Sequence, residues 1–161
     1  MLTPQRQGTP GFHSIRDSHQ MVWVLKGNSL IAVPSSSNVK PAVICSLPCK
    51  DTNVHVEGKG SLIYLGIMGA DLCLFCAEIE GQPTLQLKEK KIMDLYRENE
   101  AQVPFLFLRS IEVSTSTFQS VAYPNWFIAT SSEAGQPVIL TKERGKTYNT
   151  NFFFSAETGF Q

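Results

Sequence analysis

A short phrase recurs three times in this chain at a constant interval. It reads Gly27-Asn28-Ser29-Leu30-Ile31, then Gly81-Gln82-Pro83-Thr84-Leu85, then Gly135-Gln136-Pro137-Val138-Ile139. The glycines lie 54 residues apart in both intervals, so three such units account for a chain of 161 residues. A fixed period of this size indicates that one supersecondary unit is used three times.

Each of these glycines lies between two short apolar runs that are rich in β-branched and aromatic residues. That composition and length favour strands over helices. Glycine tolerates positive φ, so each unit is expected to open with a hairpin. Pro83 and Pro137 lack an N–H group and are expected to interrupt the strand ladder. The runs before the glycines are 22–25, 74–79 and 126–129, and the runs after them are 30–33, 85–87 and 138–140.

The remaining strand candidates bring the total to eleven or twelve, four in each unit. Three repeats of four strands predict an all-β chain with a β-trefoil fold, in which three hairpins cap a six-stranded barrel with pseudo-threefold symmetry. Closure of the barrel removes free strand edges. A three-bladed propeller would leave its axis badly filled, and a solenoid of three units would lack polar end caps. The further candidates are 42–47, 62–68, 105–110, 115–123 and 152–155, with a short strand near Tyr148.

Two segments depart from the strand pattern. Residues 88–102 are charged, and Ile92, Leu95 and Tyr96 follow helical spacing, which predicts one or two helical turns packed on the barrel. Residues 1–19 are polar and contain Pro and Gly, so we expect a flexible N-terminal arm ahead of a trefoil domain at 20–161.

Charge and hydropathy argue against several partners. The formal net charge is zero, and the basic cluster at 88–91 is interrupted by Glu89, so we expect no nucleic-acid partner. No apolar stretch is long enough to span a bilayer, and the first twenty residues lack the apolar centre of a secretory signal. We therefore expect synthesis in the cytoplasm without a signal peptide and no membrane partner.

The cysteines and histidines do not form a convincing chemical site. Cys45, Cys49, Cys73 and Cys76 have zinc-like spacing, but Cys73 and Cys76 lie in one strand run at an odd separation, which points them to opposite faces. We expect free thiols, with zinc and disulfides as weaker alternatives. The three histidines are isolated, and no phosphate-binding, dinucleotide-binding or hydrolase motif is present. The sequence predicts no catalytic residues, no metal, no cofactor and no enzyme activity.

Residues 118–130, FQSVAYPNWFIAT, followed by Val138, resemble the signature of the interleukin-1 cytokines. In that signature a strand ending in Ser-x-x-x-Pro leads into an aromatic and aliphatic strand ending in Thr. Pro124 would end the first strand, Asn125 would turn the chain, and Trp126 would enter the base of the barrel. Further phrases are similar to the interleukin-36 branch, namely QMVWVLKGNSLIAVP at 20–34, YLGI at 64–67, LCLFCAEIEG at 72–81, PTLQLKEKKIMDLY at 83–96, GQPVILTKERGK at 135–146 and NTNF at 149–152.

The resemblance implies a secreted, pro-inflammatory cytokine of innate immunity. Such a protein would bind the interleukin-36 receptor and then recruit the interleukin-1 receptor accessory protein, which starts NF-κB and MAP-kinase signalling; we expect it to act as a monomer. A receptor antagonist of the same branch and a carbohydrate-binding trefoil are the alternatives. The second is less favoured because Trp23 and Trp126 have no third counterpart and no pocket motif repeats.

The resemblance also implies a processing site. Agonists of this branch gain activity when a protease trims an exposed arm about nine residues before an aliphatic-x-Asp motif. The matching residues here are Ile15 and Asp17, flanking Arg16. The predicted mature start is therefore Arg6, after cleavage of the Gln5–Arg6 bond.

The branch contains an antagonist that carries Asp at the place resembling Asn151. Because Asn151 is neutral, the resemblance favours an agonist. It also implies that Lys146, Tyr148, Asn149 and Asn151 lie near the accessory receptor.

Overall fold

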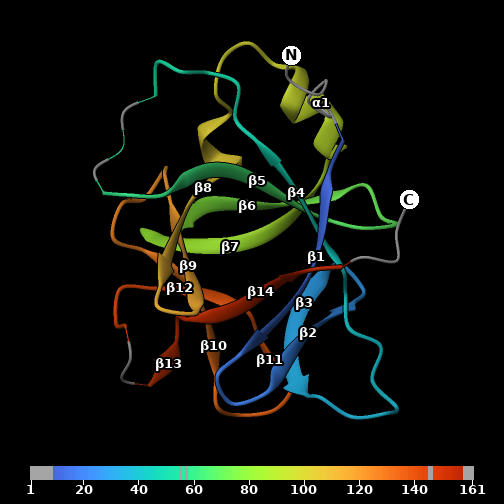
Figure 1. Cartoon of the computed structure of the whole chain (residues 1–161). Helices are drawn as coiled ribbons and strands as arrows, with labels where there is room; N and C mark the ends of the chain where they lie inside the picture. The colour runs from blue at the N-terminus through green and yellow to red at the C-terminus, as the bar shows by residue number, and fades with distance from the viewer. Residues whose placement is uncertain (1–8, 55, 57, 145–146, 158–161) are drawn as a thin grey trace.

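Six strands form a closed barrel in the computed structural model, which describes residues 9–54, 56, 58–144 and 147–157. Each strand pairs with the next in antiparallel fashion, in the order β1, β4, β5, β8, β9, β14 and back to β1. This ring confirms the predicted barrel (Figure 1). Its strands are β1 Gly11–Asp17, β4 Ile44–Pro48, β5 Ser61–Ile67, β8 Leu106–Glu112, β9 Thr115–Ser120 and β14 Phe152–Ala156.

Three hairpins complete the trefoil, one from each repeat. Strand β3 contacts β7, and β7 contacts β12, so the hairpins meet one another as threefold symmetry requires. The repeat glycines Gly27, Gly81 and Gly135 adopt φ of +62°, +78° and +84°, which confirms the turns that the repeat predicted. The hairpin strands are β2 Met21–Lys26 with β3 Ser29–Pro34, β6 Leu72–Ile79 with β7 Gln82–Glu89, and β10 Phe127–Ser131 with β12 Ile139–Thr141; two short strands are β11 Gln136–Pro137 and β13 Tyr148–Asn149.

The two repeat prolines do not interrupt the strands as expected. Pro83 lies within β7 opposite Glu78, and Pro137 lies within β11 opposite Ile31. Both strands are at the ends of the sheet order, so each proline occupies an edge strand. An edge strand has one unpaired side, where a missing N–H group does not break the ladder.

The expected arm at 1–19 differs from the structure over its second half. Residues Gly11–Asp17 form β1, which pairs with β4 and β14 and supplies one of the six barrel strands. Ile15 and Asp17 on this strand are buried. Polar residues such as Ser14 and Arg16 alternate with the buried ones, so the segment resembles a solvated arm in the sequence although it is a barrel strand.

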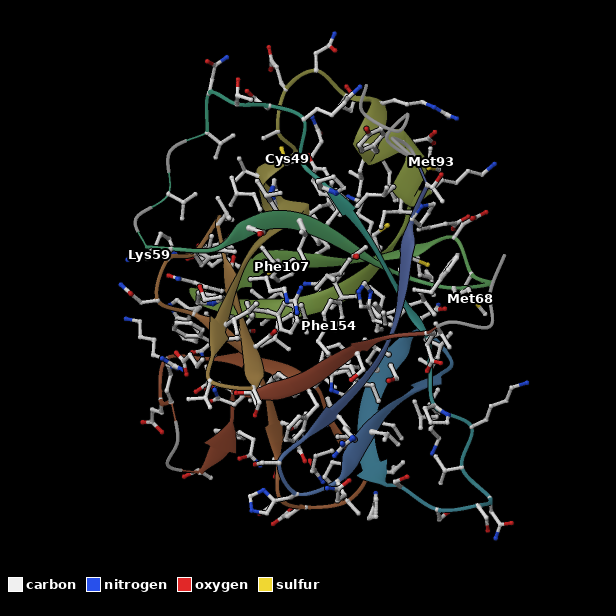
Figure 2. The ribbon with its side chains drawn as sticks, in the orientation of Figure 1. Cys49, Lys59, Met68, Met93, Phe107 and Phe154 are labelled. Atoms are coloured by element: carbon white, nitrogen blue, oxygen red, sulfur yellow. The ribbon has the colours of Figure 1, made fainter. Side chains whose placement is uncertain are left out.

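Large aromatic side chains fill the barrel. Trp23, Phe107, Phe118 and Phe152 are fully buried, and the Trp23 and Phe152 rings meet edge to face with centroids 5.4 Å apart. Figure 2 shows Phe107 and Phe154 near the middle of the molecule. Trp126, which the sequence placed in the barrel base, is half-buried and packs against this core.

The charged segment contains the predicted helical turns. Helix α1 spans Ile92–Arg97, and a 3-10 turn, η1, spans Val103–Phe105. Leu95 is fully buried and Ile92 packs beside it against a second cluster that includes Tyr64 and Phe105. The helical part is therefore anchored on the outside of the barrel. In the part of the chain that the structure describes, no helix is long and apolar enough to cross a membrane.

All four cysteines are free thiols. Cys73 and Cys76 pack into different apolar clusters, which confirms that their odd separation in a strand points them to opposite faces. Burial raises the pKa of both thiols to about 12 and that of Cys45 to about 11. These three thiols therefore stay protonated and unreactive at neutral pH.

Candidate functional site

The loop before the last strand is tied to the β8–β9 turn by Asn151. Its Nδ2 atom donates to Glu112 Oε1 at 2.9 Å and to Thr115 Oγ1 at 3.0 Å. These two acceptors flank the β8–β9 turn, in which Val113 adopts a φ of +58°. The amide of Asn151 therefore fixes the position of the loop relative to that turn.

Arg144 makes a second link between the same two segments. Its Nη2 atom donates to both Glu112 carboxylate oxygens, at 2.9 and 3.0 Å, and its Nε atom donates to Thr150 Oγ1 at 3.3 Å. The guanidinium also lies 4.7 Å above the ring of Phe127. Hydrogen bonds from Asn151 and Arg144 hold the pKa of the Glu112 carboxyl below its ordinary value.

On the other side of the loop, β13 contacts the β1–β2 turn. The Nδ2 atom of Asn149 lies 2.6 Å from His19 Nδ1, and Ser18 Oγ donates to Asn149 Oδ1 at 3.4 Å. The backbone of Asn149 pairs with Thr130 on β10. Three turns that are distant in the sequence thus lie side by side, and we call them the loop surface: residues 18–20, 111–115 and 147–151.

Apolar side chains project from the loop surface into solvent. Val113 is completely exposed, and Ile111 is 68% exposed. Exposed apolar side chains beside a rigid polar network are suited to bury against a partner protein. The described residues include no group of three or more His, Cys, Asp or Glu side chains that could hold a metal ion.

The structure brings together only part of the predicted site. Tyr148, Asn149 and Asn151 lie on the loop surface, and Lys146 lies outside the described residues. Ile15 and Asp17 are on β1, whereas Gln5 and Arg6 fall outside the described residues.

Strand β1, which contains Ile15 and Asp17 of the processing motif, ends at the loop surface. This strand runs from its pairing with Ser46 of β4, at the end of the molecule that carries α1, to Asp17 opposite Phe152 (Figure 1). The start of β1 and the loop surface therefore lie at opposite ends of the strand.

Sequence reasoning missed Glu112 and Arg144. They are 32 residues apart, and nothing in the spacing of two isolated charged residues predicts that they form an ion pair. The hydrogen bond from Thr130 Oγ1 to Asp17 Oδ2 was also missed, because the two residues are 113 positions apart in the sequence.

Comparison with known proteins agrees with the fold. A model of the Interleukin-1 / 18 family matches residues 35–154. Mus musculus interleukin-36 beta is 55% identical over 149 residues, which cover 92% of this chain and 81% of that protein. Homo sapiens interleukin-36 alpha is 49% identical over 144 residues, 89% of this chain and 91% of that protein. The chain belongs to the interleukin-1 family.

Solved structures support the same relationship. The NMR structure of the pro-inflammatory cytokine interleukin-36alpha aligns with a TM-score of 0.79 and 46% identity, over 97% of this chain and 99% of that one. A crystal structure of chicken interleukin-1 beta aligns with a TM-score of 0.77 and 26% identity, over 91% of this chain and 96% of that one. The chain is a non-enzymatic cytokine of the interleukin-36 branch, and interleukin-1 family cytokines act outside cells by binding receptors.

Glu112 gives the cytokine a testable pH dependence. Its folded pKa is lowered below the ordinary value of 4.5, so its stabilising contribution is complete above that pH and is lost as the pH falls through the folded pKa. Glu112→Gln, which keeps an acceptor for Asn151 but loses the charge, is expected to unfold at lower temperature at pH 7. The expected loss is below about 1 kcal/mol because the Glu112 side chain is 44% exposed and screened.

Thermal unfolding measured from pH 7 to pH 3 checks this expectation. The difference between the parent and Glu112→Gln should shrink as the pH falls below 4.5. A difference that stays constant over the whole range would show that Glu112 does not act through its charge.

Proposed function

We propose that this cytokine is a pro-inflammatory agonist of the interleukin-36 receptor that recruits the interleukin-1 receptor accessory protein and so activates NF-κB and MAP-kinase signalling. The similarity to interleukin-36 alpha and interleukin-36 beta supports the choice of receptor. The observation that carries the agonist assignment is the neutral amide of Asn151, which holds the loop surface together through Glu112 and Thr115. The chain is proposed to act as a monomer, with Lys146, Tyr148, Asn149 and Asn151 near the accessory receptor.

The N-terminal arm is proposed to limit activity until a protease cleaves the Gln5–Arg6 bond. Thr9 is exposed just before β1, where an arm can be reached by a protease. The point where the arm joins the barrel lies beside β4, because Gly11 pairs with Ser46.

A reporter assay in cells that carry both receptors tests the proposal. The chain starting at Arg6 is expected to reach half-maximal signalling at a concentration at least about tenfold lower than the full chain, which corresponds to about 1.4 kcal/mol. Chains starting one residue earlier or later, at Gln5 or Gln7, are the matched controls, and each should be weaker. Cells that lack either receptor should not respond.

Three results would contradict parts of the proposal. Equal potency of all chains would remove the role of the arm. Receptor binding without signalling, together with inhibition of a known agonist, would favour an antagonist. Binding to a glycan array without any receptor response would favour a carbohydrate-binding trefoil.

A further inference from the structure

We propose that Asp17 is a positioning residue, and that its buried carboxylate joins the β1–β2 turn to the strand that holds Asn149. This inference deepens the proposed function, because it explains how the Asn149 side of the loop surface obtains a fixed geometry. It also assigns the acidic residue of the aliphatic-x-Asp motif a role inside the folded protein.

The carboxylate of Asp17 is buried, and both of its oxygens accept hydrogen bonds. Its Oδ1 atom accepts hydrogen bonds from the backbone N–H groups of His19 at 2.8 Å and Met21 at 3.0 Å. Its Oδ2 atom accepts from Thr130 Oγ1 at 2.6 Å. Among the described residues, no lysine or arginine forms an ion pair with Asp17. Hydrogen bonds alone therefore compensate for burial of this charge, so each donor is held firmly in place.

The three donors belong to two segments that are distant in the sequence. His19 and Met21 follow Asp17 directly, and their bonds shape the β1–β2 turn, in which Gln20 adopts a φ of +64°. Thr130 lies on β10, 113 residues away. One side chain thus fixes the turn and attaches it to β10.

Strand β10 passes this constraint to Asn149. The backbone of Thr130 pairs with that of Asn149 across β10 and β13. The Asn149 side chain in turn contacts Ser18 and His19 of the turn that Asp17 shapes. The contacts run from Asp17 through Thr130 to Asn149 and back to the β1–β2 turn. A displacement of the turn must therefore also displace Asn149.

Burial also separates Asp17 from the processing protease. Asp17 is completely buried and Ile15 is 2% exposed, so neither side chain of the motif is available to a protease that acts on the folded protein. The fixed distance between the motif and the cleavage site then reflects where β1 is pinned in the barrel. In this view the motif marks the end of β1 that is buried at the β1–β2 turn.

NMR spectroscopy and receptor binding test the inference on the chain starting at Arg6. Asp17→Asn keeps the shape of the side chain but replaces one acceptor oxygen by a donor. The retained oxygen can still accept from His19 and Met21 but no longer carries charge, so we expect these amides to exchange with solvent up to about tenfold faster, and the Asn149 side-chain amide signals to shift because the bond from Thr130 to Oδ2 is lost. The affinity for the accessory receptor, measured in the presence of the first receptor, should fall about tenfold in the same variant.

Thr130 provides matched controls that leave the carboxylate in place. Thr130→Val removes only the link to β10, and we expect it to shift the Asn149 signals while the His19 and Met21 amides stay protected. Thr130→Ser keeps the hydroxyl and should resemble the parent. These variants test the link even if Asp17→Asn does not fold.

A double-mutant cycle separates positioning from general destabilisation. If Asp17 acts through Asn149, the double variant Asp17→Asn with Asn149→Ala should bind the accessory receptor only slightly more weakly than Asn149→Ala alone. Additive losses, or Asn149 signals that stay unchanged in both Asp17→Asn and Thr130→Val, would overturn the inference. Failure of the parent chain to bind the receptor would instead overturn the proposed function, since the NMR result judges the link between Asp17 and Asn149 by itself.

Discussion

Replacing Phe152 by alanine is expected to lower the free energy of unfolding by about 3–5 kcal/mol. The Phe152 side chain is fully buried, and its ring lies 5.4 Å from that of Trp23 and 6.2 Å from that of Phe118. Its backbone is paired with Asp17 on β1 and with Ser116 on β9. The cavity would therefore open where three of the six barrel strands meet. Single domains have a total stability of about 5–15 kcal/mol, so this loss would leave the variant near its limit.

Urea denaturation of Phe152→Ala beside Phe153→Ala measures the effect. Phe153 is the next residue on β14, but its side chain points to the other face, where the Arg16 guanidinium lies 4.5 Å from its ring. Because Phe153 is only half-buried, its loss is expected to cost about 1 kcal/mol. Similar losses in the two variants would show that Phe152 is not a centre of the core.

The barrel and its hairpins could be predicted from the sequence because each repeat contains the same local features, a turn glycine between two apolar runs. Gly27, Gly81 and Gly135 all adopt positive φ, and a residue without a Cβ atom can be recognised in the sequence. Strand β1 could not be recognised in this way. Its sequence alternates polar and apolar residues beside Pro10 and Gly11, and only pairing with β4 and β14 shows that it closes the ring.

The candidate site could be predicted only where a resemblance pointed to it. Asn149 and Asn151 were predicted because the surrounding phrase resembles the interleukin-36 branch. Their partners are far away in the sequence, since Glu112 precedes Asn151 by 39 residues. Such contacts depend on how three turns pack together at one end of the barrel. No local sequence pattern predicts which turns will pack together.

One segment of the loop surface, residues 147–151, lies where the threefold symmetry breaks. In each repeat a connection joins the hairpin to the next barrel strand, and these connections cover residues 35–43, 90–105 and 142–151. The second contains α1, whereas the third contains β13 and Asn151. The hairpins and barrel strands that repeat supply the scaffold, and the third connection supplies Asn149 and Asn151, which are proposed to contact the accessory receptor.

Asn151→Asp is expected to convert the proposed agonist into an inhibitor, with reporter activity at least about tenfold lower. The change replaces the donor that bonds Glu112 at 2.9 Å and Thr115 at 3.0 Å by a second carboxylate. Two adjacent carboxylates repel each other and would compete for Arg144, so the loop should separate from the β8–β9 turn and the pKa of Glu112 should rise. Binding to the first receptor should persist, because Asn151 is proposed to lie near the accessory receptor and the β1–β2 turn keeps its own contacts through Asn149.

Exchanging the two groups separates charge from the loss of one amide. In the double variant Asn151→Asp with Glu112→Gln, the amide and the carboxylate change places, so one donor, one acceptor and one negative charge are retained between the two side chains. This exchange is expected to restore most of the signalling that Asn151→Asp removes. Asn151→Ala, which removes the donor without adding charge, should lie between the parent and Asn151→Asp. Full signalling by Asn151→Asp, measured beside unchanged receptor binding, would show that the hydrogen bond from Asn151 to Glu112 does not control recruitment of the second receptor.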